Sequence, residues 1–321
     1  MTVAEGLAYR PVQADELERC AGIWRESINA YIRPLGQIEI GPDTAPLIRL
    51  YGHLSGTDPE RFVVGVQRDP ETGSEEVVAF ASALVRERLW FLSMLFVLPG
   101  VQASGVGRAL LARVMPAADS GMVLGTATDS AQPISNALYS TYGIVPRVPL
   151  LNLIGLPDRP EAFGELPSGV RALSFEAAVD GGGGDGQGHR ELSDAVDALD
   201  REVLGVAHPI DHRYLRQEAR HGWLYVGPDG SVLAYGYAGE AGRVGPVASR
   251  DADLVAPILG HLTREVVPRG AFAMWLPGSA DRAVVAALHA GFRLEPFPVL
   301  LCWDRPFGDF SRYLPISPGL L

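Results

Sequence analysis

The chain has 321 residues, a length that suits two domains of about 150 residues, each large enough to bury its own core. Acidic side chains outnumber basic ones by 38 to 27, and the formal charge is -11 at neutral pH. No basic field is therefore present to bind nucleic acid phosphates. Every basic residue is Arg, and the absence of Lys excludes mechanisms that use a Schiff base or a P-loop amine.

The cysteine spacing and the lengths of the apolar segments indicate the cellular compartment of the protein. The two cysteines, Cys20 and Cys302, lie far apart and lack the paired spacing of a disulfide framework or a zinc site. Residues 1–10 lack the apolar segment of a signal peptide, and no stretch approaches about 18 uninterrupted apolar residues. We therefore expect a cytoplasmic protein that does not interact with a membrane. The composition, rich in Ala, Gly, Pro and Arg, resembles that of GC-rich bacteria.

The first half of the chain alternates between helical and strand-like apolar patterns. Apolar residues three or four positions apart indicate helices, whereas continuous apolar runs bounded by turn residues indicate strands. The predicted elements are a helix over 15–31, a hairpin of strands over 62–66 and 77–85, a strand buried on both faces over 89–98, a helix over 108–115, a strand over 122–128 and a helix over 133–142.

The second half repeats this plan in a weaker form, which suggests an internal duplication. The prolines and charges of residues 155–160 indicate a linker, and we place the domains at 1–158 and 159–321. The glycine run 181–186 is expected to be a mobile insertion. The predicted elements are strands near 170–175, 223–226 and 231–238, a helix near 191–204, and a segment 270–276 that leads into a helix ending at Gly291.

The most informative segment is 95–111, in which a buried strand passes through a tight loop into a helix. Gly105 and Gly107 allow backbone angles that a Cβ would hinder, so successive N–H groups can turn toward the positive end of the helix. This arrangement predicts a pyrophosphate cradle. The loop has neither the Lys of a Walker loop nor the G-x-G-x-x-G pattern of a dinucleotide fold.

The loop Q-A-S-G-V-G at 102–107 resembles the Q/R-x-x-G-x-G/A loop of the GNAT superfamily of N-acetyltransferases. The resemblance implies acetyl-CoA as co-substrate, with the main chain of Phe96 and Val97 pairing with the pantetheine arm. The residues that it assigns to the pyrophosphate are Gln102, Ala103, Ser104, Gly105, Val106, Gly107 and Arg108.

A second motif follows at the spacing of that family. Residues 133–144 resemble its A-x-x-L-Y-x-x-x-G-F helix and match it at Leu138, Tyr139 and Gly143. Ser135 replaces the usual Ala and Ile144 the usual aromatic residue. The resemblance implies that Ser135, Asn136 and Tyr139 contact the cofactor. It also implies an α/β (α+β) fold of two tandem GNAT-like domains, each a mixed, mostly antiparallel twisted sheet flanked by helices.

Acyl transfer to an amine needs a base, an oxyanion stabiliser and a proton donor for the departing thiolate. By resemblance, Tyr139 is the general acid and the N–H near Val97 stabilises the oxyanion. The base is harder to assign, because the strand over 89–98 has Ser93 where many relatives carry a glutamate. Asp129 can act as a base or cap the following helix. Glu26 and His53 are two further candidates for the base, but both are more readily interpreted as structural or surface groups.

The second half lacks both the tyrosine proton donor and the glycine loop. Ala287 aligns with Tyr139, and residues 249–254 replace the glycine pair with carboxylates that repel a pyrophosphate, so this half is not expected to bind acetyl-CoA. His208, Asp211 and His212 are interpreted as surface polar residues of a loop, and no metal site is predicted. The apolar residues 313–321 are expected to pack against the rest of the protein. Whether the α-carboxylate at the end of this segment enters the acceptor cleft is left open.

These features favour an acetyl-CoA-dependent N-acetyltransferase that acts on the primary amine of a small molecule. Loops such as 34–54 would form the acceptor pocket. Two alternatives remain: a non-catalytic acyl-CoA-binding or interaction module, and an aminoacyl transferase of tandem GNAT type, which the negative charge disfavours. The acceptor, the acyl length and the choice between monomer and homodimer are left open.

Overall fold

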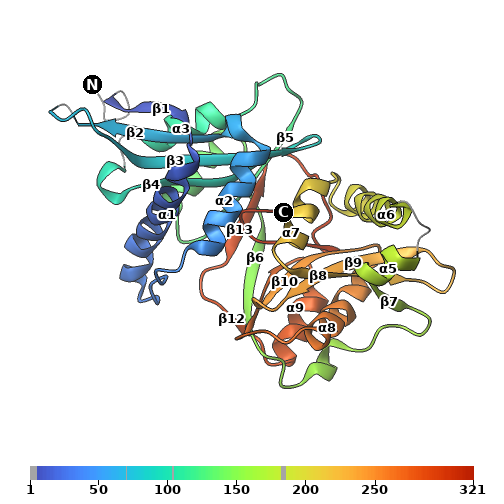
Figure 1. The fold of residues 1–321 in the computed structure, drawn as a ribbon. Coiled ribbons are helices and arrows are strands. Elements are labelled where there is room, and N and C mark those ends of the chain that lie inside the picture. Colours follow the sequence, from blue (N-terminus) through green and yellow to red (C-terminus); the bar gives the residue numbers. More distant parts are fainter. Residues whose placement is uncertain (1–5, 70, 103–104, 182–185) are drawn as a thin grey trace. The chain divides into compact units, whose positions relative to one another are not determined.

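The structure is a computed structural model that describes residues 6–69, 71–102, 105–181 and 186–321 (Figure 1). Its contacts divide the chain into Met1–Leu124, here the N-terminal unit, and Gly125–Leu321, here the C-terminal unit. The domain boundary after residue 158 stays a prediction. Within the glycine run 181–186, residues 182–185 lie outside the described residues, so the expected mobile insertion stays a prediction.

The N-terminal unit has an antiparallel sheet with the strand order β1-β2-β3-β4. Its strands are β1 (Ala8–Pro11), β2 (Phe62–Arg68), β3 (Glu75–Arg86) and β4 (Leu89–Val97). The predicted hairpin is confirmed as the β2–β3 pair.

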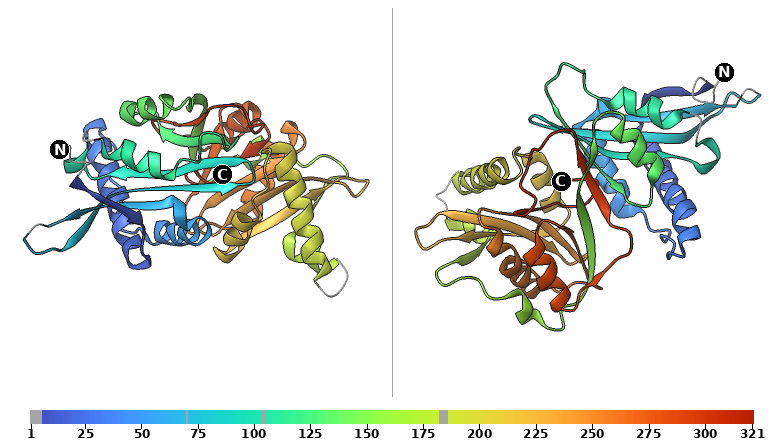
Figure 2. Two further views of the ribbon diagram at one scale, coloured as in Figure 1. Left: turned by 90° about the horizontal axis from the view of Figure 1, so that it is seen from above. Right: turned by 180° about the vertical axis from the view of Figure 1, so that it is seen from behind.

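Helices cover both faces of this sheet. They are α1 (Leu17–Ile32) and α2 (Ala45–Thr57) on one face and α3 (Val106–Val114) on the other, with 3₁₀ helices at Ala14–Glu16, Arg33–Leu35, Pro59–Arg61 and Pro99–Val101 (Figures 1 and 2). The expectation of a loop over 34–54 is wrong for its second part. There α2 begins with Pro46 in its first turn and buries Tyr51 and Leu54, which lie three positions apart.

A β-bulge in β4 changes which face its side chains reach. Ser82 pairs with Met94 and Ala83 with Leu92, so Ser93 is the extra residue. Before the bulge, the Trp90 indole donates a hydrogen bond of 2.8 Å to the Val114 carbonyl at the end of α3. Beyond the bulge, the side chains of β4 turn to the opposite face, where α1 and α2 pack. Strand β4 therefore contacts helices on both faces, as its apolar sequence predicts.

The C-terminal unit has a mixed, mostly antiparallel sheet with the strand order β5-β13-β6-β11-β10-β9-β8-β7. Its only parallel pair among the described residues is β10–β11. The strands are β5 (Val123–Asp129), β6 (Val145–Gly155), β7 (Arg171–Ser174), β8 (Arg220–Val226), β9 (Val232–Gly239), β10 (Arg243–Ser249), β11 (Phe272–Pro277) and β13 (Val299–Trp303). Two short strands, β12 (Arg293–Leu294) and β14 (Tyr313–Leu314), pair with β6 and β10.

Strand β13 was not predicted. It lies between β5 and β6, more than a hundred residues from both in sequence, and pairs antiparallel with each. A five-residue run carries little periodicity, and its neighbours become apparent only in the folded chain. The two compact units therefore group β5 and β6 with the C-terminal strand β13.

Helices also cover both faces of this second sheet. Here α8 (Val255–Glu265) and α9 (Asp281–His289) lie on one face, and α6 (Gln187–Val203) and α7 (Pro209–Gln217) lie on the other (Figures 1 and 2). The remaining helices are α4 (Pro133–Ser140), α5 (Phe175–Gly181) and the 3₁₀ helices Pro160–Phe163 and Ala252–Leu254. The expectation that residues 208–213 form a loop is wrong, because α7 begins at Pro209. This helix buries Asp211 and His212 and so lacks an apolar stripe.

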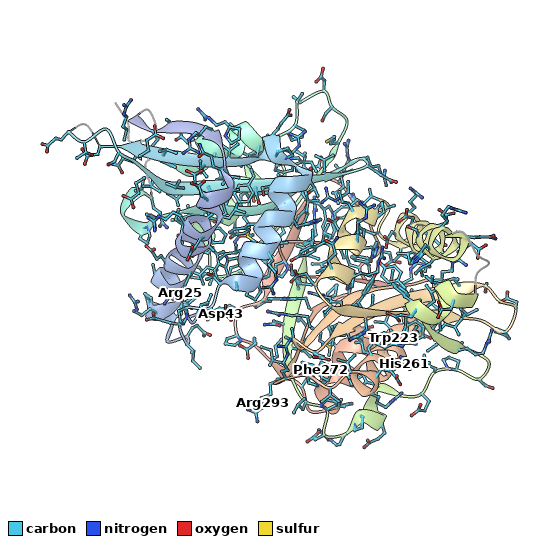
Figure 3. All side chains as sticks on the ribbon, viewed as in Figure 1. Arg25, Asp43, Trp223, His261, Phe272 and Arg293 are labelled. Carbon is cyan, nitrogen blue, oxygen red and sulfur yellow. The ribbon has the colours of Figure 1, made fainter. Side chains whose placement is uncertain are left out.

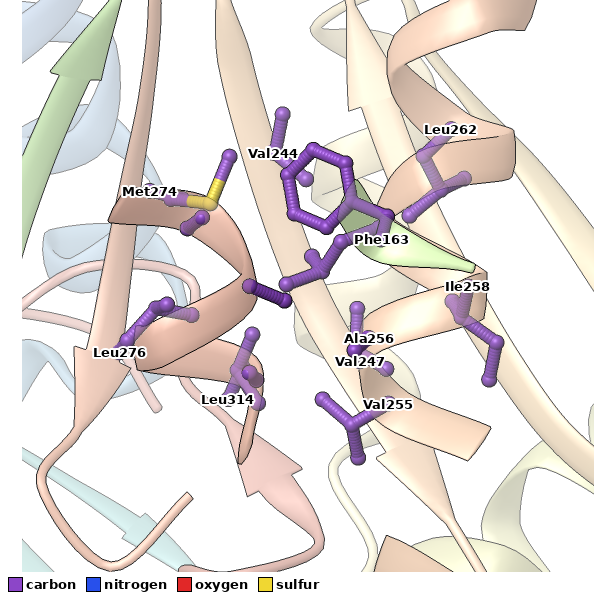
Figure 4. Packing of buried hydrophobic residues seen from close by; sticks show 14 of the residues in the cluster. Phe163, Val244, Val247, Val255, Ala256, Ile258, Leu262, Met274, Leu276 and Leu314 are labelled. Carbon is purple, nitrogen blue, oxygen red and sulfur yellow. The ribbon is translucent and has the colours of Figure 1, made fainter. Parts of the chain in front are cut away.

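The core of the C-terminal unit lies between α8 and the sheet (Figure 4). Ile258 and Leu262 of α8 pack toward β9, where a Cβ on Gly236 would lie 2.9 Å from the Leu262 side chain. The absence of a side chain at Gly236 therefore permits this close packing. Residues 313, 314, 316, 320 and 321 are buried, which confirms that the final segment docks. Among the described residues, no helix is both long and apolar enough to cross a membrane.

Candidate active site

The end of β4 is held by two side chains that meet at one carbonyl. The oxygen of Val97 accepts hydrogen bonds from Ser27 Oγ at 3.1 Å and from Gln102 Nε2 at 2.8 Å. Gln102 thus closes the turn after β4 with its side chain, and buried Ser27 ties this turn to α1. The sequence analysis missed Ser27. The signal was a polar residue in line with Cys20 and Ile23 on the buried face of a predicted helix.

The direction of the main chain distinguishes Phe96 from Val97. Leu98 N–H donates to the Val78 carbonyl at 3.0 Å, and the bonds of an antiparallel ladder alternate along a strand. The main chain of Phe96 therefore faces β3, whereas that of Val97 faces away from β3. The Phe96 ring stacks on Phe80 with centroids 5.8 Å apart. Of the two residues expected to pair with pantetheine, only Val97 directs its main chain away from the neighbouring strand.

The loop ends in a glycine that enters α3. Gly105 has a φ of +85°, lies at the N-cap of α3 and accepts the Ala109 N–H at 3.0 Å. The following N–H groups of Val106, Gly107 and Arg108 belong to the first helical turn, which carries partial positive charge. Gly107 is helical, so its glycine is not required by a positive φ, contrary to the expectation. The predicted contacts of Ala103 and Ser104 lie outside the described residues.

Val106 anchors this helix terminus by burying its side chain, together with Leu110, Leu111 and Val114 along one face of α3. The bond from Trp90 to Val114 fixes the other end of the same helix. The N-terminus of α3 is therefore held rigidly on the sheet, with Gly105 and Arg108 exposed. A rigid, positive helix terminus is a suitable site for a pyrophosphate.

In the C-terminal unit, Tyr139 lies in α4 with 4% of its surface exposed. Burial raises the pKa of Tyr139 well above its ordinary value, and a hydrogen bond with the Ser135 hydroxyl one turn earlier partly opposes this shift. The phenol is therefore neutral over the physiological pH range. It can donate a proton but cannot serve as an anion there.

The turn between β5 and α4 is built around Asp129. Its carboxylate oxygen Oδ1 accepts the Ala131 N–H at 2.8 Å, and its carbonyl accepts Asn136 Nδ2 at 3.0 Å. Asn136 Nδ2 also donates to the Gln132 carbonyl at 2.8 Å. Asp129 and Asn136 thus stabilise the start of α4, which matches the capping interpretation of Asp129 more closely than a role as base.

The weaker candidates for the base differ in exposure and in their contacts. Glu26 is exposed and forms an ion pair with Arg19 at 3.2 Å, while His53 is half-buried in α2. Ser93 is buried in the β4 bulge. None of the described residues of β4 is a carboxylate, as the sequence indicates.

In the second half, the turn that corresponds to the glycine loop is filled by its own carboxylate. Asp251 Oδ1 accepts the Asp253 N–H at 2.9 Å, and Ser249 Oγ donates to the Asp251 carbonyl at 2.7 Å. Asp253 also forms an ion pair with Arg282. An anion would meet a carboxylate here in place of free N–H groups, in agreement with the expected loss of cofactor binding.

The interpretation of His208, Asp211 and His212 as surface residues is wrong. Each has no more than 2% of its surface exposed, and all three lie in a polar cluster with Asp200. The sequence pattern gave no indication of this, because the groups that face these side chains come from β9 and from the final segment of the chain.

One family of known proteins matches part of the sequence. Residues 27–144 match the sequence model of the acetyltransferase (GNAT) family, a span that contains β4, the glycine loop and the Tyr139 helix. No curated protein sequence matches the chain. The family match therefore covers the segment in which both motifs were recognised.

Solved structures extend the likeness to the whole chain. A Pyrococcus horikoshii protein provisionally described as an acetyltransferase has a TM-score of 0.71 at 13% identity, covering 99% of this chain and 96% of its own. A tandem GNAT protein from the clavulanic acid biosynthesis pathway has a TM-score of 0.51 at 18% identity, with 94% and 99% covered. Saccharomyces cerevisiae N-myristoyltransferase with bound myristoyl-CoA has a TM-score of 0.51 at 10% identity, with 96% and 83% covered.

The family match over residues 27–144, which contain the strand–loop–helix motif, supports an acyltransferase. Residues 27–144 match the GNAT family, and the fold of the whole chain is similar to that of a tandem GNAT protein.

Proposed function

We propose that this protein transfers an acetyl group from acetyl-CoA to the primary amine of a small molecule. The observation that carries the proposal is the turn from β4 into α3, where Gly105 adopts a left-handed conformation and opens a fixed helix N-terminus. The first N–H groups of α3 would bind the pyrophosphate, with Gln102 closing the turn. A pyrophosphate carries the charge that this helix terminus favours.

The chemistry assigns separate roles to three groups. A neutral amine attacks the thioester carbonyl, a new C–N bond forms, and the C–S bond breaks as the thiolate leaves. We assign the developing oxyanion to the N–H of Val97, whose main chain faces away from β3. Tyr139 would donate its phenolic proton to the thiolate. Burial raises the pKa of Tyr139, which keeps the phenol protonated at neutral pH but also makes it a weaker acid.

The base remains unassigned, and a direct role for Asp129 is disfavoured because its carboxylate is bonded to the Ala131 N–H. Relay of the amine proton through water is the simplest route. The charge of -11 favours a small cationic amine over a nucleic acid as acceptor. A cytoplasmic location stays a prediction from the sequence.

Two measurements test the proposal. Calorimetry with acetyl-CoA should give binding that is lost in Gly105→Glu, because a carboxylate would then occupy the anion site. A panel of amines, assayed for free thiol release, should then show acceptor-dependent turnover. Binding without turnover for any amine would instead indicate a non-catalytic acyl-CoA-binding module. Absence of binding at millimolar acetyl-CoA would contradict the proposal outright.

The acyl group needs its own comparison, because one of the similar structures is an N-myristoyltransferase with bound myristoyl-CoA. Acetyl-CoA, a medium-chain acyl-CoA and myristoyl-CoA should be compared at equal concentrations with the best amine. We expect acetyl-CoA to give the highest kcat/KM. A filter-binding assay with tRNA at physiological salt addresses aminoacyl transfer, and we expect no retention of tRNA.

A further inference from the structure

The C-terminal unit contains a buried polar cluster that the proposed acyl transfer does not use. Asp200 lies near the end of α6, and His208 and His212 lie at the start of α7. Their exposed fractions are 0%, 2% and 2%. Burial on this scale requires that the polar atoms of all three side chains be well compensated.

The three side chains direct one atom each toward a common point. Asp200 Oδ2 lies 2.8 Å from His212 Nε2 and 3.3 Å from His208 Nε2. One ligand-type atom from each residue lies within 4.8 Å of the other two. His208 and His212 are four positions apart on one helix face, and their rings stack with centroids 4.4 Å apart. Two imidazoles and one carboxylate are a donor set found in zinc sites and in sites of other divalent transition metals.

The other ring nitrogens of the two histidines meet oxygen atoms. His212 Nδ1 lies 3.0 Å from the Tyr237 hydroxyl, and His208 Nδ1 lies 3.7 Å from Asp211 Oδ2. A histidine that binds a metal through one nitrogen characteristically directs the other to an oxygen, which fixes the tautomer and the ring. His212 has such an oxygen within hydrogen-bond distance, whereas the carboxylate nearest to His208 Nδ1 lies just beyond that distance.

Two tyrosines complete the surroundings. The Tyr235 hydroxyl donates to Asp200 Oδ1 at 2.5 Å, which leaves Oδ2 to face the imidazoles. The Tyr313 hydroxyl lies 3.2 Å from His208 Nε2. Tyr235 comes from β9 and Tyr313 from β14, so four separate segments of the chain meet here.

Charge also favours a cation. Asp197 lies one turn before Asp200 on the same helix. Asp197 Oδ1 is buried and has no hydrogen-bond partner among the described residues. Asp197, Asp200 and Asp211 thus place three carboxyl groups beside two imidazoles, an arrangement that a divalent ion would stabilise.

We propose that Asp200, His208 and His212 form a binding site for a divalent transition metal of the Zn²⁺ class. Asp200 Oδ2 and the two Nε2 atoms would be the ligands, with Tyr313 at hand for a further position. The metal would join α6, α7 and the final segment of the chain, and its role would be structural. Metal binding here does not depend on the acyl transfer proposed above.

A metal-free network is the competing state, and it differs in where the protons lie. Without a metal, the Nε2–H groups of His208 and His212 donate to Asp200. With a metal, both Nε2 atoms must offer lone pairs, and their protons move to Nδ1, where Asp211 and Tyr237 can accept them. Because the ligands are buried, a metal would enter while the chain folds, and the experiment must include refolding.

The test is to unfold the purified protein in denaturant with a chelator, refold it with or without metal, and measure bound metal after gel filtration. We expect one Zn²⁺ per chain, no retention of Mg²⁺, and the visible absorption of tetrahedral Co²⁺ on Co²⁺ substitution. Zn²⁺ at about 100 times its Kd should raise Tm by on the order of 5 °C relative to refolding without metal.

Asp200→Asn and His212→Gln should each abolish the Co²⁺ absorption and the Zn²⁺-dependent rise in Tm. The matched control is His261→Gln, which removes a half-buried histidine of the same unit that bonds to the Tyr225 hydroxyl at 3.1 Å and lies beside Trp223 (Figure 3). This control should bind the metal like the wild type. If a variant fails to fold, the stoichiometry and Co²⁺ spectrum of the wild type decide alone. A wild type that refolds without retaining Zn²⁺ or Co²⁺, or variants that retain one equivalent, would overturn the proposal.

Discussion

Tyr139 and Ala287 occupy equivalent positions in two helices that end in the same way. The Tyr139 carbonyl accepts the Ile144 N–H at 3.2 Å, and the Ala287 carbonyl accepts the Phe292 N–H at 3.0 Å. In each case the residue before the donor is a glycine with a positive φ, 78° in α4 and 102° in α9. This pattern is the Schellman motif. The two helices therefore end with the same geometry, and in this alignment the second one buries a methyl group where the first has a phenol.

Tyr139→Phe should lower the rate of acetyl transfer by about 10²- to 10⁴-fold and leave acetyl-CoA affinity nearly unchanged, because the phenol acts on the leaving thiolate. Single-turnover kinetics and calorimetry measure the two quantities. Tyr142→Phe is the matched control, because it makes the same change on the half-buried Tyr142 three residues further on and should leave both quantities unchanged. Equal turnover by the Tyr139→Phe and wild-type enzymes in a chemistry-limited assay would refute the assignment.

Ala287→Leu tests the other half of the repeat. Ala287 is fully buried among the core residues of the C-terminal unit, so a larger side chain should destabilise the fold by about 1–3 kcal/mol. Chemical denaturation measures this change. Acetyl-CoA should bind in a ratio of one per chain in both proteins, and a titration that gives two would show that the second half also binds the cofactor.

The two glycines of the loop should respond differently to alanine. Gly105→Ala places a side chain at a φ of +85° and should cost about 1–2 kcal/mol of strain, with weaker acetyl-CoA binding. Gly107→Ala lies in a helical turn and should leave the free energy of unfolding unchanged or improve it by up to about 1 kcal/mol. Its methyl group should nevertheless weaken acetyl-CoA binding if the pyrophosphate approaches this turn. Unaltered affinity in both variants would argue against the loop as the cofactor site.

The pH dependence follows from the raised pKa of Tyr139. A general acid loses activity as the pH rises through its pKa, and burial moves the pKa of this phenol upward. The rate should therefore rise with pH between about pH 6 and 9 as the amine acceptor loses its proton, with no alkaline loss in that window. A kcat profile with a descending limb near pH 8 that disappears in Tyr139→Phe would contradict this expectation.

Breaking the buried ion pair between Arg86 and Asp58 should destabilise the N-terminal unit more than breaking an exposed one. Arg86 Nη1 donates to Asp58 Oδ2 at 2.8 Å, and Val85 N–H donates to Oδ1 of the same carboxylate at 2.9 Å. Removing the cation by Arg86→Met leaves the buried carboxylate without an opposite charge and should destabilise the fold by about 3–5 kcal/mol. The control is Arg33→Met, which removes the exposed partner of Glu39 and should leave Tm unchanged. Comparable Tm values for the two variants would disprove this ranking.

Local sequence determined the parts of the molecule in which backbone geometry follows from neighbouring residues. The predicted hairpin, the buried strand that became β4, and the helices that became α1, α3 and α4 rest on apolar spacing and turn residues. The glycine loop and the Tyr139 helix were recognised for the same reason, since each motif lies within a short segment. Gly105 in particular has the left-handed φ that its residue type predicts.

The tertiary structure determined those features that depend on contacts between residues distant in sequence. The position of β13 between β5 and β6, and the bond from Ser27 to the Val97 carbonyl, join residues separated by many positions. Helix α7 escaped prediction because it buries His212 against Asp200 and Tyr237 instead of an apolar stripe. Polar side chains enter a core only where other segments supply their hydrogen bonds, and no local pattern encodes those segments.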